Sequence, residues 1–259
     1  MDNTVALALG SMALPEPTLM TILMVVVFAG AFITSGFGIG GGVLMTSLFI
    51  VFLPPKFGIG LLAPLMLLIS AAGVRQYWKQ WEKHHLLVLL PSSLVGIWLG
   101  TYLLAEIPPE IVRKTVGVLA LAFGTIQFLV IDRPEWRNRL RPPTWQGVGF
   151  GFGSGISSAL AHTGGIVFSF YLLPHSRTKE IFIGTTVFLF CTSGLIKVGA
   201  YVYYGILTWP ILLLSLTLIP ALIIGSVTGK WLNRRISNKL FMRLVSIFIA
   251  LMGVRLILG

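Results

Sequence analysis

Two side chains that can bind or move charge, Lys197 and His162, lie inside strongly apolar stretches of the sequence. Lys197 lies well within the apolar run 181–204, where a buried ammonium is costly and usually functional. His162 is the one histidine outside the loop clusters, and because imidazole titrates near neutral pH it can bind an anion or carry a coupling proton. Each residue also has a structural interpretation. Lys197 can reach the membrane interface along its apolar stem, and His162 can be a neutral, hydrogen-bonded ring.

A second basic residue and several hydroxyls extend this candidate anion site. Arg75 ends the apolar run 57–76. An internal repeat match of Ser70–Gly73 with Cys191–Gly194 places it opposite Ile196, one residue before Lys197. Arg75 can equally be an anchor on the positively charged side of the membrane. Hydroxyl donors to an oxyanion are expected from Ser35, Ser158, Thr163, Thr192 and Ser193. Serine and threonine often donate instead to carbonyls of their own helix, so each hydroxyl alone is weak support.

Carboxylates are missing from the apolar segments. All eight acidic residues lie in loops or at segment ends: Asp2, Glu16, Glu82, Glu106, Glu110, Asp132, Glu135 and Glu180. This argues against cation transport and against a carboxylate proton relay, and it agrees with an anionic substrate. The G-x-S-x-G pattern of serine hydrolases is satisfied at neither Ser154 nor Ser157, which disfavours an intramembrane enzyme. A single cysteine, Cys191, excludes an internal disulfide and argues against a cysteine metal site. No cofactor is expected.

The composition is that of an all-α polytopic membrane protein. Of the 259 residues, 56% are hydrophobic and 10% charged, whereas soluble domains carry roughly a quarter charged residues. The net charge of +11 resides mainly in short loops, which is typical of topology signals and anionic lipid contacts rather than of nucleic-acid binding. Apolar segments are expected near 18–52, 57–76, 86–104, 110–130, 145–173, 181–204, 208–230 and 240–258.

The glycine-rich stretch 35–43, SGFGIGGGV, contains a formal G-x-G-x-x-G. A dinucleotide-binding turn needs a preceding strand and an acidic residue about 20 positions on, and both are missing. The stretch is better explained as a helix broken at membrane depth, which requires that the backbone be buried in protein or line a cavity. Two broken helices would direct backbone N–H groups near Gly41–Gly42 and Gly164–Gly165 at one anion. Close packing of small residues is the alternative, and both can hold.

The two halves of the chain share ordered matches. Pro91-x4-Gly96-x3-Gly100 recurs as Pro220-x4-Gly225-x3-Gly229, and 41–43 matches 164–166. Equivalent loops differ in charge: 75–85 is basic and 203–209 is uncharged, while 104–110 is acidic and 230–239 is basic. By the positive-inside rule the halves are inverted. We therefore expect a first repeat at 1–130, a basic cytoplasmic connector at 131–145 and a second repeat at 146–259. Each repeat has a broken hairpin, 18–52 or 145–173, and three crossings.

These glycine patterns and the duplicated layout resemble the TauE/SafE sulfite exporter family, also called the 4-toluene sulfonate uptake permease family. The resemblance covers nearly the whole chain. It implies a multi-pass permease of the cell inner membrane that moves small sulfur-containing anions such as sulfite, thiosulfate or organosulfonates by secondary transport. A coupling proton and a homo-oligomer are compatible with it. The alternatives are a passive anion channel and, from other classes, an intramembrane enzyme or a membrane assembly subunit.

Overall fold

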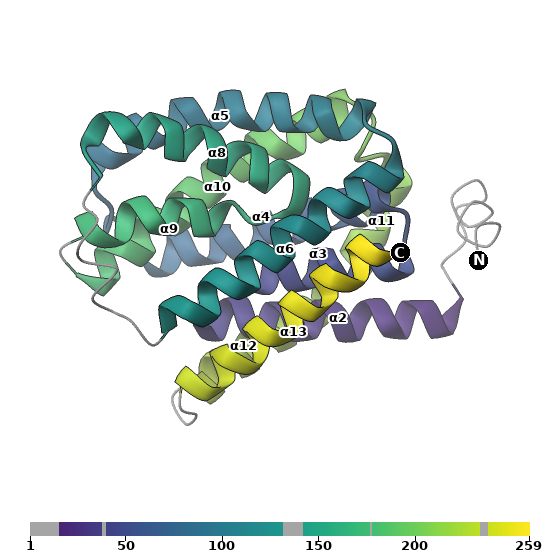
Figure 1. Ribbon diagram of the computed structural model, residues 1–259. Helices are drawn as coiled ribbons and strands as arrows, with labels where there is room; N and C mark the ends of the chain where they lie inside the picture. The colour runs from purple at the N-terminus through teal and green to yellow at the C-terminus, as the bar shows by residue number, and fades with distance from the viewer. Residues whose placement is uncertain (1–15, 38–39, 132–141, 177, 234–237) are drawn as a thin grey trace.

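The computed structural model describes residues 16–37, 40–131, 142–176, 178–233 and 238–259, and every regular element in these ranges is helical (Figure 1). Most of the expected connector 131–145 lies outside the described residues. The all-α prediction is confirmed. The elements are α2 (Pro17–Phe37), α3 (Gly41–Phe52), α4 (Pro55–Gln76), α5 (Lys83–Glu106), α6 (Pro109–Ile131), a 3-10 turn η1 (Thr144–Gln146), α8 (Gly147–Ala161), α9 (Gly164–His175), α10 (Lys179–Tyr203), α11 (Trp209–Thr217), α12 (Ile219–Asn233) and α13 (Asn238–Leu258).

Several of these helices match the thickness of a bilayer. Within the described residues, α2, α4, α5, α6 and α10 are long and apolar enough to cross a membrane, and the bent pair α11–α12 makes a sixth candidate. Large apolar side chains such as Leu87, Val95 and Val227 are exposed on the outer surface of the bundle, where lipid rather than water is the expected neighbour. The prediction of a polytopic membrane protein is confirmed.

Two helix pairs fold back on themselves as hairpins. In the first pair, a Cβ atom on Gly41 of α3 would collide with Thr34 of α2. In the second pair, the Ser154 hydroxyl of α8 donates to the Gly164 carbonyl of α9 at 2.7 Å. The sequence predicts a broken hairpin at 18–52, and in the structure its first helix, α2, has 21 residues and is long enough to span a bilayer. After Pro17 the apolar run contains no further proline and a single glycine, Gly30, before the glycine-rich stretch, and one interior glycine costs only about 1 kcal/mol, so the helix continues.

Helices of one half pack mainly against helices of the other half. The largest contacts join α5 to α8, α2 to α12, α6 to α13 and α4 to α10, and Figure 1 shows α5 beside α8 at one edge of the bundle. Glycines permit this close approach. A Cβ atom on Gly96 would collide with the Phe152 carbonyl, and one on Gly229 with the Phe32 carbonyl. The Pro-Gly-Gly segments found in the sequence therefore form helix–helix interfaces in both halves.

Equivalent helices of the two halves run antiparallel where they meet. Between α4 and α10, Gly73 faces Val187 and Gly194 faces Leu67. Between α6 and α13, Gly117 approaches the Gly253 carbonyl, while residues further along α6 approach residues nearer the start of α13. Opposite directions of equivalent helices are what inverted repeats require. The inverted-repeat relation, with boundaries at 130 and 146, stays a prediction.

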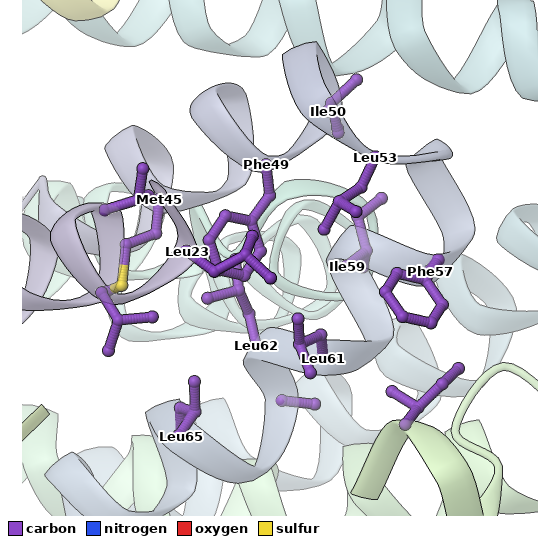
Figure 2. Packing of buried hydrophobic residues seen from close by; sticks show 14 of the residues in the cluster. Leu23, Met45, Phe49, Ile50, Leu53, Phe57, Ile59, Leu61, Leu62 and Leu65 are labelled. Carbon is purple, nitrogen blue, oxygen red and sulfur yellow. The ribbon is translucent and has the colours of Figure 1, made fainter. Parts of the chain in front are cut away.

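The packed apolar centre lies where the first hairpin meets α4. Phe49 of α3 and Leu62 of α4 are fully buried there, and Leu23 of α2 is buried in the same cluster (Figure 2). Together they fix the first hairpin against α4. Because protein interiors are close-packed, this contact fixes the position of the hairpin tip relative to α4.

One predicted segment is divided in the structure. The sequence predicts a single apolar segment at 208–230, but α11 and α12 meet at Leu218 with a bend of 45°. Pro220 explains the break, because a proline has no N–H to donate to the preceding turn and its ring clashes with the carbonyl four residues earlier. The Thr217 hydroxyl donates to the Leu214 carbonyl at 2.7 Å, which also favours bending.

Candidate functional site

The tips of the two hairpins touch each other near the middle of the molecule. The second tip is the turn His162–Thr163 between α8 and α9, and His162 has a positive φ of 54°. A Cβ atom on Gly42, in the first turn of α3, would lie 3.0 Å from the His162 carbonyl oxygen. The Thr46 hydroxyl of α3 lies 3.4 Å from His162 Nδ1. The two sequence stretches that were expected to hold an anion therefore meet in space.

A cavity of about 80 Å³ lies at this junction. A buried water needs about 10–15 Å³ measured in the same way, so the cavity has room for about six water-sized particles. Sulfite has four non-hydrogen atoms, so the cavity has the size of a small oxyanion. Helices α2, α3, α4 and α10 and the second hairpin all contribute to its lining: Thr34, Gly40, Gly42, Val43, Ala63, Met66, Leu67, Ile69, Ser70, Ser158, His162, Thr163, Gly165, Ile166, Phe190, Ser193, Gly194 and Lys197.

Lys197 brings a cation to this cavity. Its side chain is only 5% exposed, although it lies in a helix that is long enough to span the membrane. Its ammonium donates to the Ser158 hydroxyl at 3.2 Å and to the Ser158 carbonyl at 3.4 Å. Among the described residues no carboxylate pairs with it. A buried ammonium held only by one neutral residue is an incomplete arrangement, because buried charges are normally paired.

The imidazole of His162 is held at one edge and unpartnered at the other. Nδ1 approaches the Thr46 hydroxyl, whereas Nε2 is buried and has no hydrogen-bond partner. The ring lines the same cavity as Lys197. Buried polar atoms are satisfied in most proteins, so an unpartnered nitrogen beside a cavity is suited to bind a ligand there.

The hydroxyls expected to bind an oxyanion are mostly used within the protein. Thr163 donates to the Ser157 carbonyl at 3.0 Å and Thr192 to the Phe188 carbonyl at 3.0 Å. The Ser158 hydroxyl accepts from Lys197. These side chains therefore hold the second hairpin and α10 in shape. The Ile166 N–H donates to the Thr163 carbonyl at 3.1 Å. The N–H groups of Gly164 and Gly165, the first two residues of α9, have no acceptor within their own helix and remain suited to an anion.

Seven of the twelve residues predicted from the sequence line the cavity and five do not. Those in the lining are Gly42, Ser158, His162, Thr163, Gly165, Ser193 and Lys197. Gly41 packs against α2 instead, and Gly164 packs against Ser154. Arg75 is exposed in the last turn of α4. Ser35 is half-buried in α2, and Thr192 lies on α10 outside the lining.

Sequence reasoning missed several polar and apolar lining residues. Thr34 and Ser70 line the cavity from α2 and α4, and Met66 and Phe190 supply apolar walls. Ser70 begins the stretch 70–73 that matches Cys191–Gly194 in the internal repeat. This match could have identified Ser70 as a candidate. Thr34 immediately precedes the predicted Ser35.

Among the described residues, no group of three or more His, Cys, Asp or Glu side chains could hold a metal ion.

The fold and the cavity define a polytopic helical membrane protein with a cation-bearing site between two broken-helix hairpins.

A family model described as "Sulfite exporter TauE/SafE" matches residues 22–256, and the chain belongs to this family. It is a family of membrane transporters of the sulfite and anion exporter type, and the resemblance seen in the sequence is confirmed. The chain matches no curated protein and no solved structure.

Proposed function

We propose that this protein is a secondary transporter of small sulfur-containing anions, sulfite or an organosulfonate, in the cell inner membrane. The observation that carries the proposal is the buried Lys197 ammonium, which lines a cavity of anion size and has no carboxylate partner among the described residues. A charge at membrane depth is costly and marks a substrate pathway. The family indicates the chemical class of the substrate. The cavity volume and the Lys197 ammonium in its lining favour a small, negatively charged solute.

The anion would lie between the two hairpins and be held by three kinds of group. Lys197 neutralises its charge. The N-terminal turns of α3 and α9, which begin at Gly41 and Gly164, offer amide groups and the positive ends of their helix dipoles. The apolar walls exclude other solutes. Because each half contributes a hairpin tip, a movement of one half relative to the other would open the cavity to alternate sides of the membrane.

The test is uptake of labelled sulfite, thiosulfate and methanesulfonate into proteoliposomes. Lys197→Met keeps an unbranched apolar stem and removes the charge, and Lys114→Met on the exposed face of α6 is the matched control. A hydrogen bond to a charged group is worth about 1.5–3 kcal/mol, so we expect about 10- to 100-fold weaker apparent affinity for Lys197→Met and no change for Lys114→Met. Flux that does not saturate in the wild type would instead identify a passive channel. No flux of any of these anions would refute the substrate class.

A further inference from the structure

The hydrogen bonding of Thr46 determines which nitrogen of His162 carries a proton. The Thr46 hydroxyl donates its single proton to the Gly42 carbonyl at 2.8 Å. It can therefore only accept from His162 Nδ1, which lies 3.4 Å away. In the neutral imidazole one nitrogen is a donor and the other an acceptor. With Nδ1 as the donor, Nε2 keeps an unshared electron pair, and this is the buried nitrogen without a partner.

An electron pair on Nε2 repels an anion in the same cavity. Both His162 and Lys197 line this space of about 80 Å³, so an anion attracted by Lys197 brings its oxygens close to the ring. A proton placed between Nε2 and an oxygen turns this repulsion into a charge-assisted hydrogen bond. Without an anion, a protonated ring beside Lys197 would put two like charges in one buried space, which is unfavourable. Anion and proton therefore favour each other's binding.

The charges around His162 support this coupling. Lys197 from α10 is the other titratable group in the cavity lining, whereas α2, α3 and α4 contribute only neutral residues to it. Helices α5 and α6 pack on α8, and their ionisable side chains among the described residues lie in the two turns nearest a helix end: Lys83, His84, His85, Tyr102, Glu106, Glu110, Arg113 and Lys114. No carboxylate of the described residues faces the ring to compensate a proton, so the substrate must do so.

We propose that the site binds each anion together with one proton, and that Nε2 of His162 is the atom that takes this proton. The inference rests on the proposed transport function. In the step, an anion enters from the open side, a proton from water on that side bonds to the electron pair of Nε2, and the imidazolium donates to an anion oxygen. On the other side the N–H bond breaks, the proton returns to water, and the anion leaves.

The coupling has an electrical consequence. A monoanion and one proton together carry no net charge, and Lys197 stays with the protein. Transport of a monoanion is then electroneutral, driven by the pH gradient and the anion gradient and independent of the membrane potential. Near neutral pH sulfite is partly present as hydrogensulfite, which carries a proton of its own. The diagnostic substrate is therefore methanesulfonate, which stays ionised and unprotonated at neutral pH.

The experiment measures protons and methanesulfonate together in proteoliposomes that contain a pH-sensitive dye, with the membrane potential clamped by potassium and valinomycin. The wild type is expected to move about one proton per anion. His162→Asn removes the titrating ring, and asparagine tolerates the positive φ of 54° at this position. We expect its residual flux to carry no proton and to respond to the membrane potential. His84→Asn, at an exposed histidine, is the control and should keep the wild-type ratio.

A second variant tests the same inference without altering the ring. Thr46→Val keeps the side-chain shape but leaves Nδ1 without its acceptor, so the neutral ring can place its proton on Nε2 and bind an anion without taking up another. We expect Thr46→Val to transport methanesulfonate with fewer than one proton per anion, whereas a merely structural role of Thr46 would leave that ratio unchanged. A wild-type flux without proton movement, or an unchanged ratio in both variants, would overturn the inference and leave the proposed function intact. Absence of any flux in the wild type would overturn both.

Discussion

Lys197→Met should be more stable than the wild type without anion and less stable than the wild type in saturating anion. The side chain is 5% exposed, and its two hydrogen bonds to Ser158 are long, at 3.2 and 3.4 Å. A lysine at the centre of a membrane helix costs about 2.5–3.5 kcal/mol. One well-made hydrogen bond from a charged donor returns about 1.5–3 kcal/mol. The two contacts here are long and go to the same residue, so we count them together as one such bond of roughly 2 kcal/mol. Without anion, the Lys197 side chain therefore destabilises the folded wild type by about 1 kcal/mol.

Lys197→Met removes this cost, so the variant without anion should melt above the wild type. A change of 1 kcal/mol shifts Tm by roughly 2–4 °C in proteins of about this size. Anion at 100 times its Kd stabilises a protein that binds it by about 2.7 kcal/mol, which corresponds to roughly 5–11 °C at the same conversion. The wild type should gain this shift and Lys197→Met should gain little, so the wild type becomes the more stable protein in saturating anion.

The assay is thermal unfolding of detergent-solubilised protein at one fixed scan rate, because the apparent Tm of such proteins depends on the rate of heating. Sulfite or methanesulfonate is titrated against the wild type, Lys197→Met and the surface control Lys114→Met. The control should follow the wild type at every concentration. If Lys197→Met melts below the wild type without anion, or if anion raises the Tm of both proteins equally, then Lys197 is a structural residue and the reasoning is wrong.

Two further predictions concern packing and topology. Gly229→Ala should destabilise the protein by about 1–3 kcal/mol, because its Cβ atom would collide with the Phe32 carbonyl. Gly199→Ala in α10 is the control and should be neutral or stabilising, because a Cβ atom there meets nothing within 4 Å. Thermal unfolding of both variants compares them directly. In a background whose single cysteine is replaced, Lys83→Cys should be labelled by a membrane-impermeant thiol reagent only from the cytoplasmic side and Tyr203→Cys only from the other side. Labelling of both from one side would contradict the inverted repeats.

The helices could be predicted well from the sequence because apolar runs and charged loops directly reflect the thickness and sidedness of a bilayer. Which face of each helix lines the cavity could not be predicted from the sequence. A helix that is apolar all round has no polar stripe to indicate its phase, so Gly41 and Gly42 looked equivalent. Neighbouring residues are 100° apart on a helix, and in the structure Gly41 packs on α2 while Gly42 lines the cavity.

Arg75 shows a second limit of sequence reasoning. The repeat alignment placed it opposite Ile196, beside Lys197, but alignment gives equivalence between halves and not proximity in space. Arg75 is nine residues beyond Met66, which lines the cavity, and this spacing is about 13 Å along a helix. In an inverted arrangement, equivalent residues toward the C-terminal ends of antiparallel helices lie on opposite sides of the membrane. Lys197, six residues before the end of α10, reached the cavity, and Arg75, one residue before the end of α4, did not.

The two hairpin tips make different contributions to one site. The first tip is rich in glycine, and Gly42 lets its backbone approach the His162 carbonyl to a distance where a Cβ atom would lie only 3.0 Å away. The second tip supplies the chemistry through His162 and, by way of Ser158, through Lys197. Gly42→Ala should therefore separate the tips, weaken the 3.4 Å contact between Thr46 and His162 Nδ1, and lower the number of protons moved per anion more than it lowers the binding of the anion by Lys197. An equal loss of both would show that the tips only pack against each other.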